Sequence, residues 1–271
     1  MTTAVILGVA NSRSIAWHCV KSLLQTHQNI VFTYQSPRFE GNVEKLLQSI
    51  PTNNDDENLK RKIQAIPCDV SEEENIRKLF IDDIPSILNV NGNNDNEMKI
   101  KTIVHSIAYA PPEAMKNTSL LQTTQEAFSM THNISSYSFL SVARHALPLL
   151  HPSSSLVALS YLGAVRAVPN YNIMGPAKAS LESIIRGLAY DLGSHGIRVN
   201  GVSSGPINTM SAKGITGFSS MKADAASKSC LKRDVSLREV ADSVAFLASD
   251  AASGITGQIL YADCGYSIVA S

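Results

Sequence analysis

Short, continuously hydrophobic runs alternate along the chain with segments of helical periodicity, and this alternation constrains the fold more than any other feature. Runs without a polar face are typical of strands in a parallel sheet covered on both sides. The pattern predicts an α/β fold, a Rossmann-like doubly wound parallel sheet with right-handed crossovers, in a single domain over residues 1–271. We expect strands at residues 4–7, 30–34, 63–68, 103–106, 155–160, 198–203 and 259–262.

Two segments have the clearest helical stripe, residues 14–24 and residues 178–192. Two other stretches, residues 51–60 and 89–97, are rich in Asn and Asp and too polar to enter a core. We interpret them as surface loop insertions. The apolar stripes consist of Ile15, Cys19, Val20, Leu23 and Leu24 in the first helix and of Leu181, Ile184, Ile185, Leu188 and Leu192 in the second.

Charge and hydropathy exclude several classes of partner. Lys+Arg and Asp+Glu both number 23, so the formal net charge is zero, whereas nucleic-acid binding favours a basic excess. No apolar run approaches the roughly 18 residues of a membrane span. We therefore expect no nucleic acid and no membrane as partners. Only 17% of residues are charged, which indicates that part of the surface is buried in an oligomer.

The cysteines and histidines show no metal-binding spacing, and we expect no metal. Cys19 and Cys68 lie in apolar runs and are expected to be buried thiols in a reducing compartment. His105 is expected to be a packed or surface histidine and not a base. The first strand begins near the start of the chain, so we expect a cytoplasmic protein. A plastid or mitochondrion is the alternative if a transit peptide has been removed.

The first strand runs into Gly8, followed by a helix that begins near Ser14 and Ile15. Free N–H groups and the positive end of a helix dipole at such a turn suit the pyrophosphate of a dinucleotide. Only one glycine of the usual three-glycine fingerprint is present. Ser14 is therefore either a phosphate contact or a plain helix N-cap.

The ends of the next strands extend the candidate cofactor site. Gln35 could hydrogen-bond a free adenosine ribose, as NADH requires. Arg38 would attract the extra phosphate of NADPH, or it lies in a solvated turn. Asp69-Val70 is well placed for adenine, and Ser106-Ile107-Ala108 would lie beneath the pyrophosphate and the nicotinamide ribose. The sequence favours NADH, with NADPH as the alternative.

A phenol and an ammonium group, Tyr171 and Lys178, lie seven residues apart. At about 100° per residue, seven steps along a helix nearly complete two turns, so in a helix the two side chains would lie on one face. Most nucleotide-dependent reductases that pair Tyr with Lys place them four apart, and no Tyr here has a Lys four residues later. The wider spacing favours reduction of a carbon–carbon double bond over reduction of a carbonyl.

Nine motifs in order carry a family resemblance. They are Gly8-x5-Ser14-Ile-Ala, Phe32-Thr-Tyr-Gln35, Cys68-Asp69-Val70, His105-Ser-Ile-Ala108, Ile134-Ser-Ser-Tyr-Ser-Phe139, Ser160-Tyr161-Leu-Gly, Asn170-Tyr171-Asn, Ala177-Lys178-Ala-Ser-Leu and Gly205-Pro206-Ile207-Asn-Thr209. Together they resemble the NADH-dependent enoyl-acyl-carrier-protein reductases of type II fatty-acid synthesis, a branch of the short-chain dehydrogenase/reductase superfamily. Only the two Asn-rich stretches stand outside the match.

The resemblance implies roles for individual residues. Tyr171 would donate a hydrogen bond to the thioester carbonyl of a trans-2-enoyl substrate, and Lys178 would bind the hydroxyls of the nicotinamide ribose. Tyr161 would line the substrate pocket with Ala110. Ile207 and Thr209 would bind the nicotinamide end of the cofactor, and residues 209–221 would form the substrate-binding loop.

The same resemblance implies an acyl carrier protein or CoA thioester as substrate and a homotetramer. In typical short-chain reductases an Asn supports a proton-relay water, and alignment on residues 146–148 puts Ser135 there, as in the enoyl reductase branch. Basic residues that dock carrier protein in the bacterial enzymes are missing from residues 214–221 of the loop, although Lys213 and Lys222 flank this stretch.

Two other functions remain open at this stage. One is a carbonyl-reducing short-chain dehydrogenase, which the absence of a four-residue Tyr–Lys spacing and of the relay Asn disfavours. The other is a catalytically idle NAD-binding sensor or scaffold. An idle fold has no chemical need to keep Tyr161, Tyr171 and Lys178 together, so the residues favour an enzyme.

Overall fold

The computed structural model of the chain describes residues 2–50, 62–88, 99–115, 119–209, 211–214 and 216–269. The predicted insertions at residues 51–60 and 89–97 lie outside this described part. Within it, seven strands form one parallel sheet in the order β3-β2-β1-β4-β5-β6-β7. The strands are β1 Thr3–Leu7, β2 Asn29–Tyr34, β3 Lys62–Pro67, β4 Ile100–His105, β5 Leu150–Tyr161, β6 Arg198–Ser204 and β7 Ile259–Ala262.

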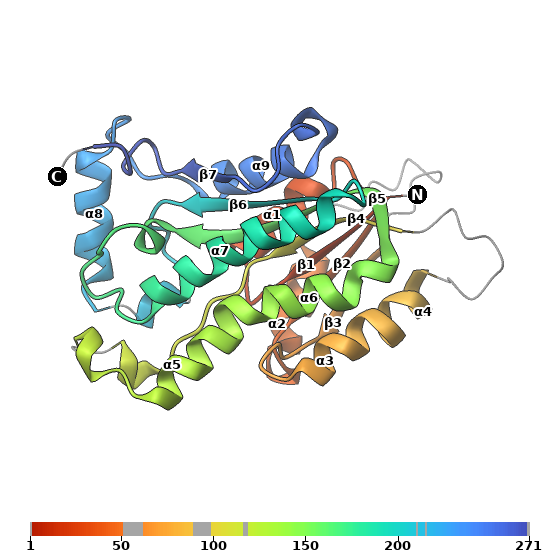
Figure 1. Cartoon of the computed structure of the whole chain (residues 1–271), viewed down its shortest axis with the longest axis horizontal. Helices are drawn as coiled ribbons and strands as arrows, with labels where there is room; N and C mark the ends of the chain where they lie inside the picture. Colours follow the sequence, from red (N-terminus) through yellow and green to blue (C-terminus); the bar gives the residue numbers. More distant parts are fainter. Residues whose placement is uncertain are drawn as a thin grey trace.

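Helices cover both faces of the sheet, and two hydrophobic clusters fill the layers between (Figure 1). One cluster joins the sheet to α3, α4, α6 and α7, and the other joins it to α1, α2 and α9. The predicted Rossmann-like α/β fold is confirmed. The helices are α1 Ile15–Leu23, α2 Glu40–Gln48, α3 Glu73–Lys78, α4 Ile84–Leu88, α5 Gln125–His132, α6 Ser138–Ala146, α7 Met174–Gly193, α8 Phe218–Lys228 and α9 Leu237–Ala248.

The order of the strands reverses between β1 and β4, where the chain winds outward in both directions. Because the strands are parallel, their carboxyl ends share one edge of the sheet, which lies to the left in Figure 1 beside α5 and α8. In open α/β sheets, ligands bind at this edge, next to the point of reversal. The predicted site residues follow these strand ends.

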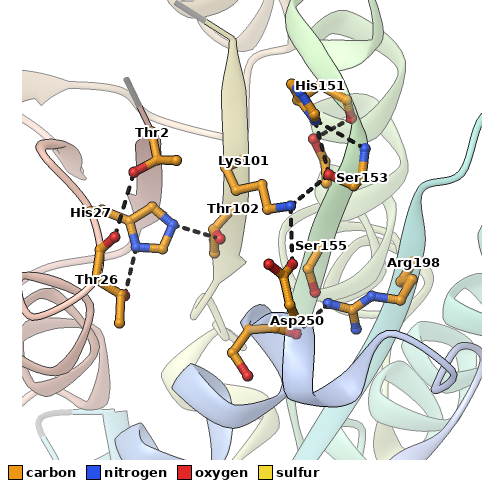
Figure 2. A network of polar contacts seen from close by, with 12 residues as sticks. Thr2, Thr26, His27, Lys101, Thr102, His151, Ser153, Ser155, Arg198 and Asp250 are labelled. Atoms are coloured by element: carbon orange, nitrogen blue, oxygen red, sulfur yellow. Dashed lines mark hydrogen bonds and ion pairs between the residues drawn. The ribbon is translucent and has the colours of Figure 1, made fainter.

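The opposite, amino edge is held by a polar network (Figure 2). Lys101 of β4 donates to Ser153 of β5 at 2.6 Å and forms an ion pair with Asp250 at 3.3 Å. Arg198 at the start of β6 donates to carbonyl oxygens of Leu247 and Ser249 at the end of α9, at 2.8 and 3.0 Å. The network ties three neighbouring strands to one helix end.

The predicted apolar stripes are largely confirmed. Cys19, Val20 and Leu23 are buried on α1, as are Leu181 and Ile185 on α7. Tight burial raises the pKa of Cys19 to about 12, and burial raises that of Cys68 to about 12, so both thiols stay protonated.

All four cysteines are free; Cys230 is exposed and Cys264 half-buried. His105 is fully buried beside Phe139, with Nε2 2.8 Å from the Ser138 hydroxyl, which confirms it as a packed histidine. Among the described helices, none combines the length and the hydropathy that a bilayer span requires.

Candidate active site

Tyr171 lies in the loop that connects β5 to α7. Its neighbours Asn170 and Asn172 adopt left-handed backbone conformations, with φ of 62° and 41°. Asn tolerates this region better than most residues. The Tyr171 carbonyl accepts from the Met174 amide at 3.0 Å, which leads the loop directly into the first turn of α7. The helix therefore begins at Met174, with Pro176 in its first turn.

The predicted tyrosines meet at the end of β5. Their rings lie 4.7 Å apart between centroids, at an interplanar angle of 59°, and both are more than nine-tenths buried. Burial, with a smaller effect from Tyr266, raises the pKa of Tyr161 to about 12. Burial, then the neighbouring Tyr161, raises the pKa of Tyr171 further. Both phenols therefore keep their protons at neutral pH and act as hydrogen-bond donors.

Gly163 creates the space for the Tyr171 ring. A Cβ atom at this glycine would lie 2.3 Å from Cδ1 and 2.7 Å from Cε1 of Tyr171, closer than carbon atoms approach. The sequence motif Ser160-Tyr161-Leu-Gly contained this glycine, but sequence reasoning gave it no role.

Both tyrosines belong to an apolar cluster at this end of the sheet. Ala108 and Ala110, both predicted site residues, pack against it from the turn after β4. Sequence reasoning missed the other members, because no chemical motif marks aliphatic residues. The buried members are Ala114, Met115, Ala127, Tyr161, Tyr171, Ile173 and Met174.

Lys178 lies one helical turn into α7 and is buried, with 4% of its surface exposed. Its Nζ donates to the Leu159 carbonyl at 2.7 Å and to the Ile107 carbonyl at 3.4 Å. Burial lowers the pKa of Lys178 to about 8, against the opposing effect of Glu182. The ammonium group is thus fixed between the ends of β4 and β5, on the predicted nicotinamide-ribose turn.

The turns after β1 and β4 lie against each other at the point of strand reversal. Gly8 has φ of 96°, and a Cβ atom there would lie 2.4 Å from the Ser106 carbonyl oxygen. Only glycine fits both conditions. Ser14 caps α1, since its Oγ accepts from the Trp17 amide at 3.3 Å and donates to the Asn11 carbonyl at 2.7 Å. The structure thus shows Ser14 as the N-cap of α1, with Ile15 as the first helical residue; contact with a phosphate stays a prediction.

The ends of β2 and β3 are joined by side chains. Gln35 Nε2 donates to Asp69 Oδ2 at 3.3 Å, and Arg38 donates to Gln35 Oε1 at 3.3 Å. Val70 is buried in the core beside them. This edge offers a dinucleotide polar groups at two places, Gln35 and Lys178, and between them Gly8 lets the turns after β1 and β4 pack closely.

Ile207 and Thr209 follow β6, where the Thr209 amide donates to the Ile207 carbonyl at 2.8 Å. The final residues of the predicted loop at 209–221 form the first turn of α8, which begins at Phe218. The Tyr161 hydroxyl donates to Met221 Sδ at 3.8 Å, so α8 reaches the tyrosine pair.

A cavity of about 340 Å³ opens between α8 and the loop before Tyr171. Arg166 and Asn170 line it on the loop side, and Met221 and Asp224 on the α8 side. Asn170 also donates to the Thr216 carbonyl at 2.9 Å, which holds the two walls together. The cavity lies next to the tyrosine pair, because Met221 contacts Tyr161.

Ser135 is fully buried in a π-helical stretch, Asn133–Tyr137, between α5 and α6. Its Oγ donates to the Tyr109 carbonyl and accepts from the Tyr109 amide, both at 2.9 Å. The single hydroxyl proton is used inside the protein, so Ser135 holds the turn after β4 in place.

Of the two lysines that flank the loop, Lys222 forms an ion pair with Asp234, with Nζ 2.7 Å from Oδ2. Its charge is therefore paired within the chain. The side chain of Lys213 lies outside the described residues.

Comparisons with known proteins agree with this geometry. The family model described as enoyl-(acyl carrier protein) reductase matches residues 8–267. NADH-dependent enoyl-[acyl-carrier-protein] reductases from Neisseria meningitidis and Haemophilus influenzae are 41% and 38% identical to the chain, over 97% and 98% of its length and 94% of theirs.

Solved structures agree as well. The Bacillus cereus enoyl-acyl carrier protein reductase, solved with NADP+ and indole naphthyridinone, superposes with a TM-score of 0.89 at 37% identity. The NADH enzyme of Aquifex aeolicus superposes with a TM-score of 0.86 at 36% identity. Both matches cover 100% of this chain and 98% of the other. The chain belongs to the enoyl-(acyl carrier protein) reductase family.

Proposed function

We propose that this protein reduces trans-2-enoyl thioesters to saturated acyl thioesters with NADH, the last reductive step of fatty-acid elongation. The buried pair Tyr161 and Tyr171 beside the buried Lys178 carries the proposal. Its family membership supports the same activity. We also propose that residues 1–271 form a single NAD-binding domain.

The cofactor residues follow from the strand ends. Gly8, with the turn to Ser14 and Ile15, would receive the pyrophosphate. Gln35 would face the adenosine ribose, and Asp69-Val70 would contact adenine. When bound, NADH supplies the hydride that is added to the β-carbon. Ser106-Ile107-Ala108, Lys178, Ile207 and Thr209 would hold the nicotinamide end.

Tyr171 stabilises the charge that the reaction creates. Hydride addition to a conjugated thioester moves negative charge to the carbonyl oxygen, and a preorganised donor there lowers the barrier. The raised pKa of Tyr171 keeps its hydroxyl protonated for this role. The Ser135 hydroxyl gives its proton to the Tyr109 carbonyl, so it has no second proton to donate to a relay water.

Lys178 positions the nicotinamide ribose and adds positive charge near the carbonyl oxygen. Its contacts with the Leu159 and Ile107 carbonyls hold the ammonium group at one place. A fixed cation loses little entropy when the cofactor binds. Tyr161 and Ala110 line the substrate pocket.

The family implies an acyl carrier protein thioester as substrate, and a CoA thioester presents the same reacting group. Because Lys222 is paired with Asp234, we do not assign carrier docking to it. Arg38 is available for the extra phosphate of NADPH once its contact with Gln35 opens, so NADPH remains an alternative. The cytoplasmic location stays a prediction.

We propose a homotetramer. Tyr190 on α7 is 88% exposed in the single chain, and Leu260 and Tyr261 are exposed on the edge strand β7. Apolar side chains on an open strand edge favour pairing with another copy. The low fraction of charged residues agrees with a buried surface.

One assay tests the activity and the two principal roles. NADH absorbance is followed with crotonyl-CoA and, separately, with acetoacetyl-CoA, and NADH affinity is measured by fluorescence. We expect oxidation with the enoyl substrate. Tyr171→Phe should lower kcat by about 10²–10³-fold with unchanged NADH affinity, since a single donor to a developing oxyanion has that effect. Lys178→Ala should weaken NADH binding by at least about tenfold, or about 1.4 kcal/mol.

Ser253→Ala, which removes an exposed hydroxyl far from the tyrosine pair, is the control for Tyr171→Phe. Oxidation with acetoacetyl-CoA alone would establish carbonyl reduction instead. Tight NADH binding without turnover of either substrate would establish the idle sensor. Unchanged NADH affinity in Lys178→Ala would refute the ribose role.

A further inference from the structure

One buried acid near the site has no part in the reaction described above. Glu182 lies on α7 one helical turn after Lys178, and only 4% of its surface is exposed. A carboxylate is seldom buried so deeply without a partner, because burial penalises its charge. The residues around Glu182 therefore show which contacts stabilise the buried carboxylate.

Two adjacent residues at the end of β5 hold the two charged side chains of α7. The Leu159 carbonyl accepts from Lys178 Nζ at 2.7 Å, and the Ser160 hydroxyl donates to Glu182 Oε1 at 2.6 Å. No ion pair within 4.0 Å joins Lys178 to Glu182 among the described residues. The carboxylate therefore lies one helical turn from the ammonium group, at a position held by Ser160.

The charges around the pair have defined signs. Burial lowers the pKa of Lys178 to about 8, and Glu182 opposes that shift. Burial raises the pKa of Glu182, whereas the hydrogen bond from Ser160 and the cations Arg186 and Lys178 lower it. From β4, His105 also faces Lys178, but its pKa of about 3 keeps it neutral. From β7, the phenol of Tyr261 faces Glu182 and stays protonated.

We propose that Glu182 is a positioning residue for cofactor binding: its carboxylate, held by Ser160, keeps Lys178 a charged ammonium group in a dry site. The proposal rests on the ribose-binding role of Lys178 proposed above. Glu182 touches neither substrate nor cofactor. Its effect is to extend the pH range over which the cofactor is bound tightly.

The test measures the dissociation constant of NADH by fluorescence from pH 6 to pH 10. In the wild type, affinity should fall as Lys178 loses its proton, with a midpoint near its pKa of about 8. Glu182→Gln removes the charge and keeps the shape. We expect its midpoint about one pH unit lower, the low end of the effect of a nearby opposite charge. At pH 6 the two proteins should bind NADH equally, because Lys178 is charged in both.

The matched control is Asp191→Asn, which removes an equal charge from an exposed position on the same helix. Its midpoint should not move, because water screens exposed charges. If Glu182→Gln fails to fold, Ser160→Ala with Glu182→Met replaces both partners and leaves no buried hydroxyl unpaired. This double variant should show the same shift.

Three outcomes would overturn the proposal: a Glu182→Gln curve that superposes on the wild type, a loss of affinity equal at every pH, or a wild type whose affinity does not change up to pH 10. The Lys178→Ala variant distinguishes a failure of the role proposed for Lys178 from a failure of the role proposed for Glu182. If it leaves NADH affinity unchanged, the ribose role of Lys178 fails; if it weakens NADH while Glu182→Gln causes no shift, only the role of Glu182 fails.

Discussion

Gly163 determines where the ring of Tyr171 can lie. The absent side chain leaves the space that Tyr171 fills, 2.3 Å from where a Cβ atom would be. A glycine next to a catalytic aromatic residue can therefore be as restrictive as the aromatic residue itself. The backbone of Gly163 also lies close to α7, since a Cβ atom at Gly175 would lie 3.1 Å from its carbonyl oxygen.

Gly163→Ala should displace the Tyr171 ring. We expect a lower kcat and a loss of about 1–3 kcal/mol in unfolding free energy, as overpacking a tight site causes. Gly187→Ala is the control, since no atom lies within 4 Å of a Cβ atom there. In α7, alanine should stabilise by up to about 1 kcal/mol. Urea unfolding and the NADH assay measure both variants, and wild-type behaviour of Gly163→Ala would contradict the packing argument.

At the residue scale, sequence reasoning found the groups that have their own chemistry. Tyr171 and Lys178 stood out by their spacing, and the structure brings them to the same edge of the sheet. Gly163 and Glu182 could not be assigned in that way, because their roles depend on contacts between the end of β5 and α7. The N-cap role of Ser14 depends on its hydrogen bonds, which only the structure gives.

At the element scale, hydrophobic runs predicted every strand of the described sheet, but several starts were wrong. β4 begins at Ile100 and not at residue 103, because the polar side chains of Lys101 and Thr102 belong to the strand and join the amino-edge network. β5 begins at Leu150, although Pro152 and the serines after it read as a turn. Pro176 lies in the first turn of α7, where its missing N–H has no helical acceptor.

Arg198 stabilises the end of α9. It is nine-tenths buried and donates to the Leu247 and Ser249 carbonyls, which the helix itself leaves unpaired. Arg198→Met should cost about 1–3 kcal/mol of unfolding free energy, because the Ser249 carbonyl loses its donor, whereas the Leu247 carbonyl keeps the Ser155 hydroxyl. Urea unfolding measures the loss, and kcat should not change, since the site lies at the opposite edge of the sheet.

The control for this change is Arg238→Met. Arg238 lies on α9 itself, and 81% of its side chain is exposed. It should change the unfolding free energy by less than about 0.5 kcal/mol. Equal losses in both variants would mean that the buried contacts of Arg198 contribute nothing beyond those of a surface arginine.

At the scale of the whole molecule, the edge formed by the carboxyl ends of the strands and the edge formed by their amino ends differ in structure. The carboxyl edge places backbone turns and a few buried polar groups around open space. The amino edge is closed by its own polar network (Figure 2). The parallel arrangement separates the two, so the sequence order of the strands was enough to predict on which edge the site lies. The distances within the site follow from tertiary packing, which the strand order does not contain.

The buried side chain of His105 makes the free energy of unfolding of the whole chain depend on pH. Burial, then the charge of Lys178, lowers the pKa of His105 from 6.5 to about 3. Between these values the unfolded chain binds a proton that the folded chain does not. The contribution of His105 is therefore complete above pH 6.5 and is lost progressively as pH falls toward 3.

Urea unfolding of the wild type and of His105→Gln across pH 7 to 4 measures this contribution. The variant should be less stable at pH 7, because it loses packing against Phe139, but its stability should fall less steeply with pH. His195→Gln, at an exposed position after α7, should keep the wild-type slope. Parallel curves for His105→Gln and the wild type would show that this histidine does not stay neutral on folding.

The four cysteines differ in exposure, so the protein can be labelled with a fluorescent dye without mutation. Cys19 and Cys68 are buried and protonated, and Cys264 is half-buried with a pKa that burial raises. Cys230 is exposed two residues beyond the end of α8. A maleimide dye added at neutral pH therefore attaches to one position, next to the helix that contacts the tyrosine pair. The native chain thus offers one labelling position beside the helix that contacts Tyr161.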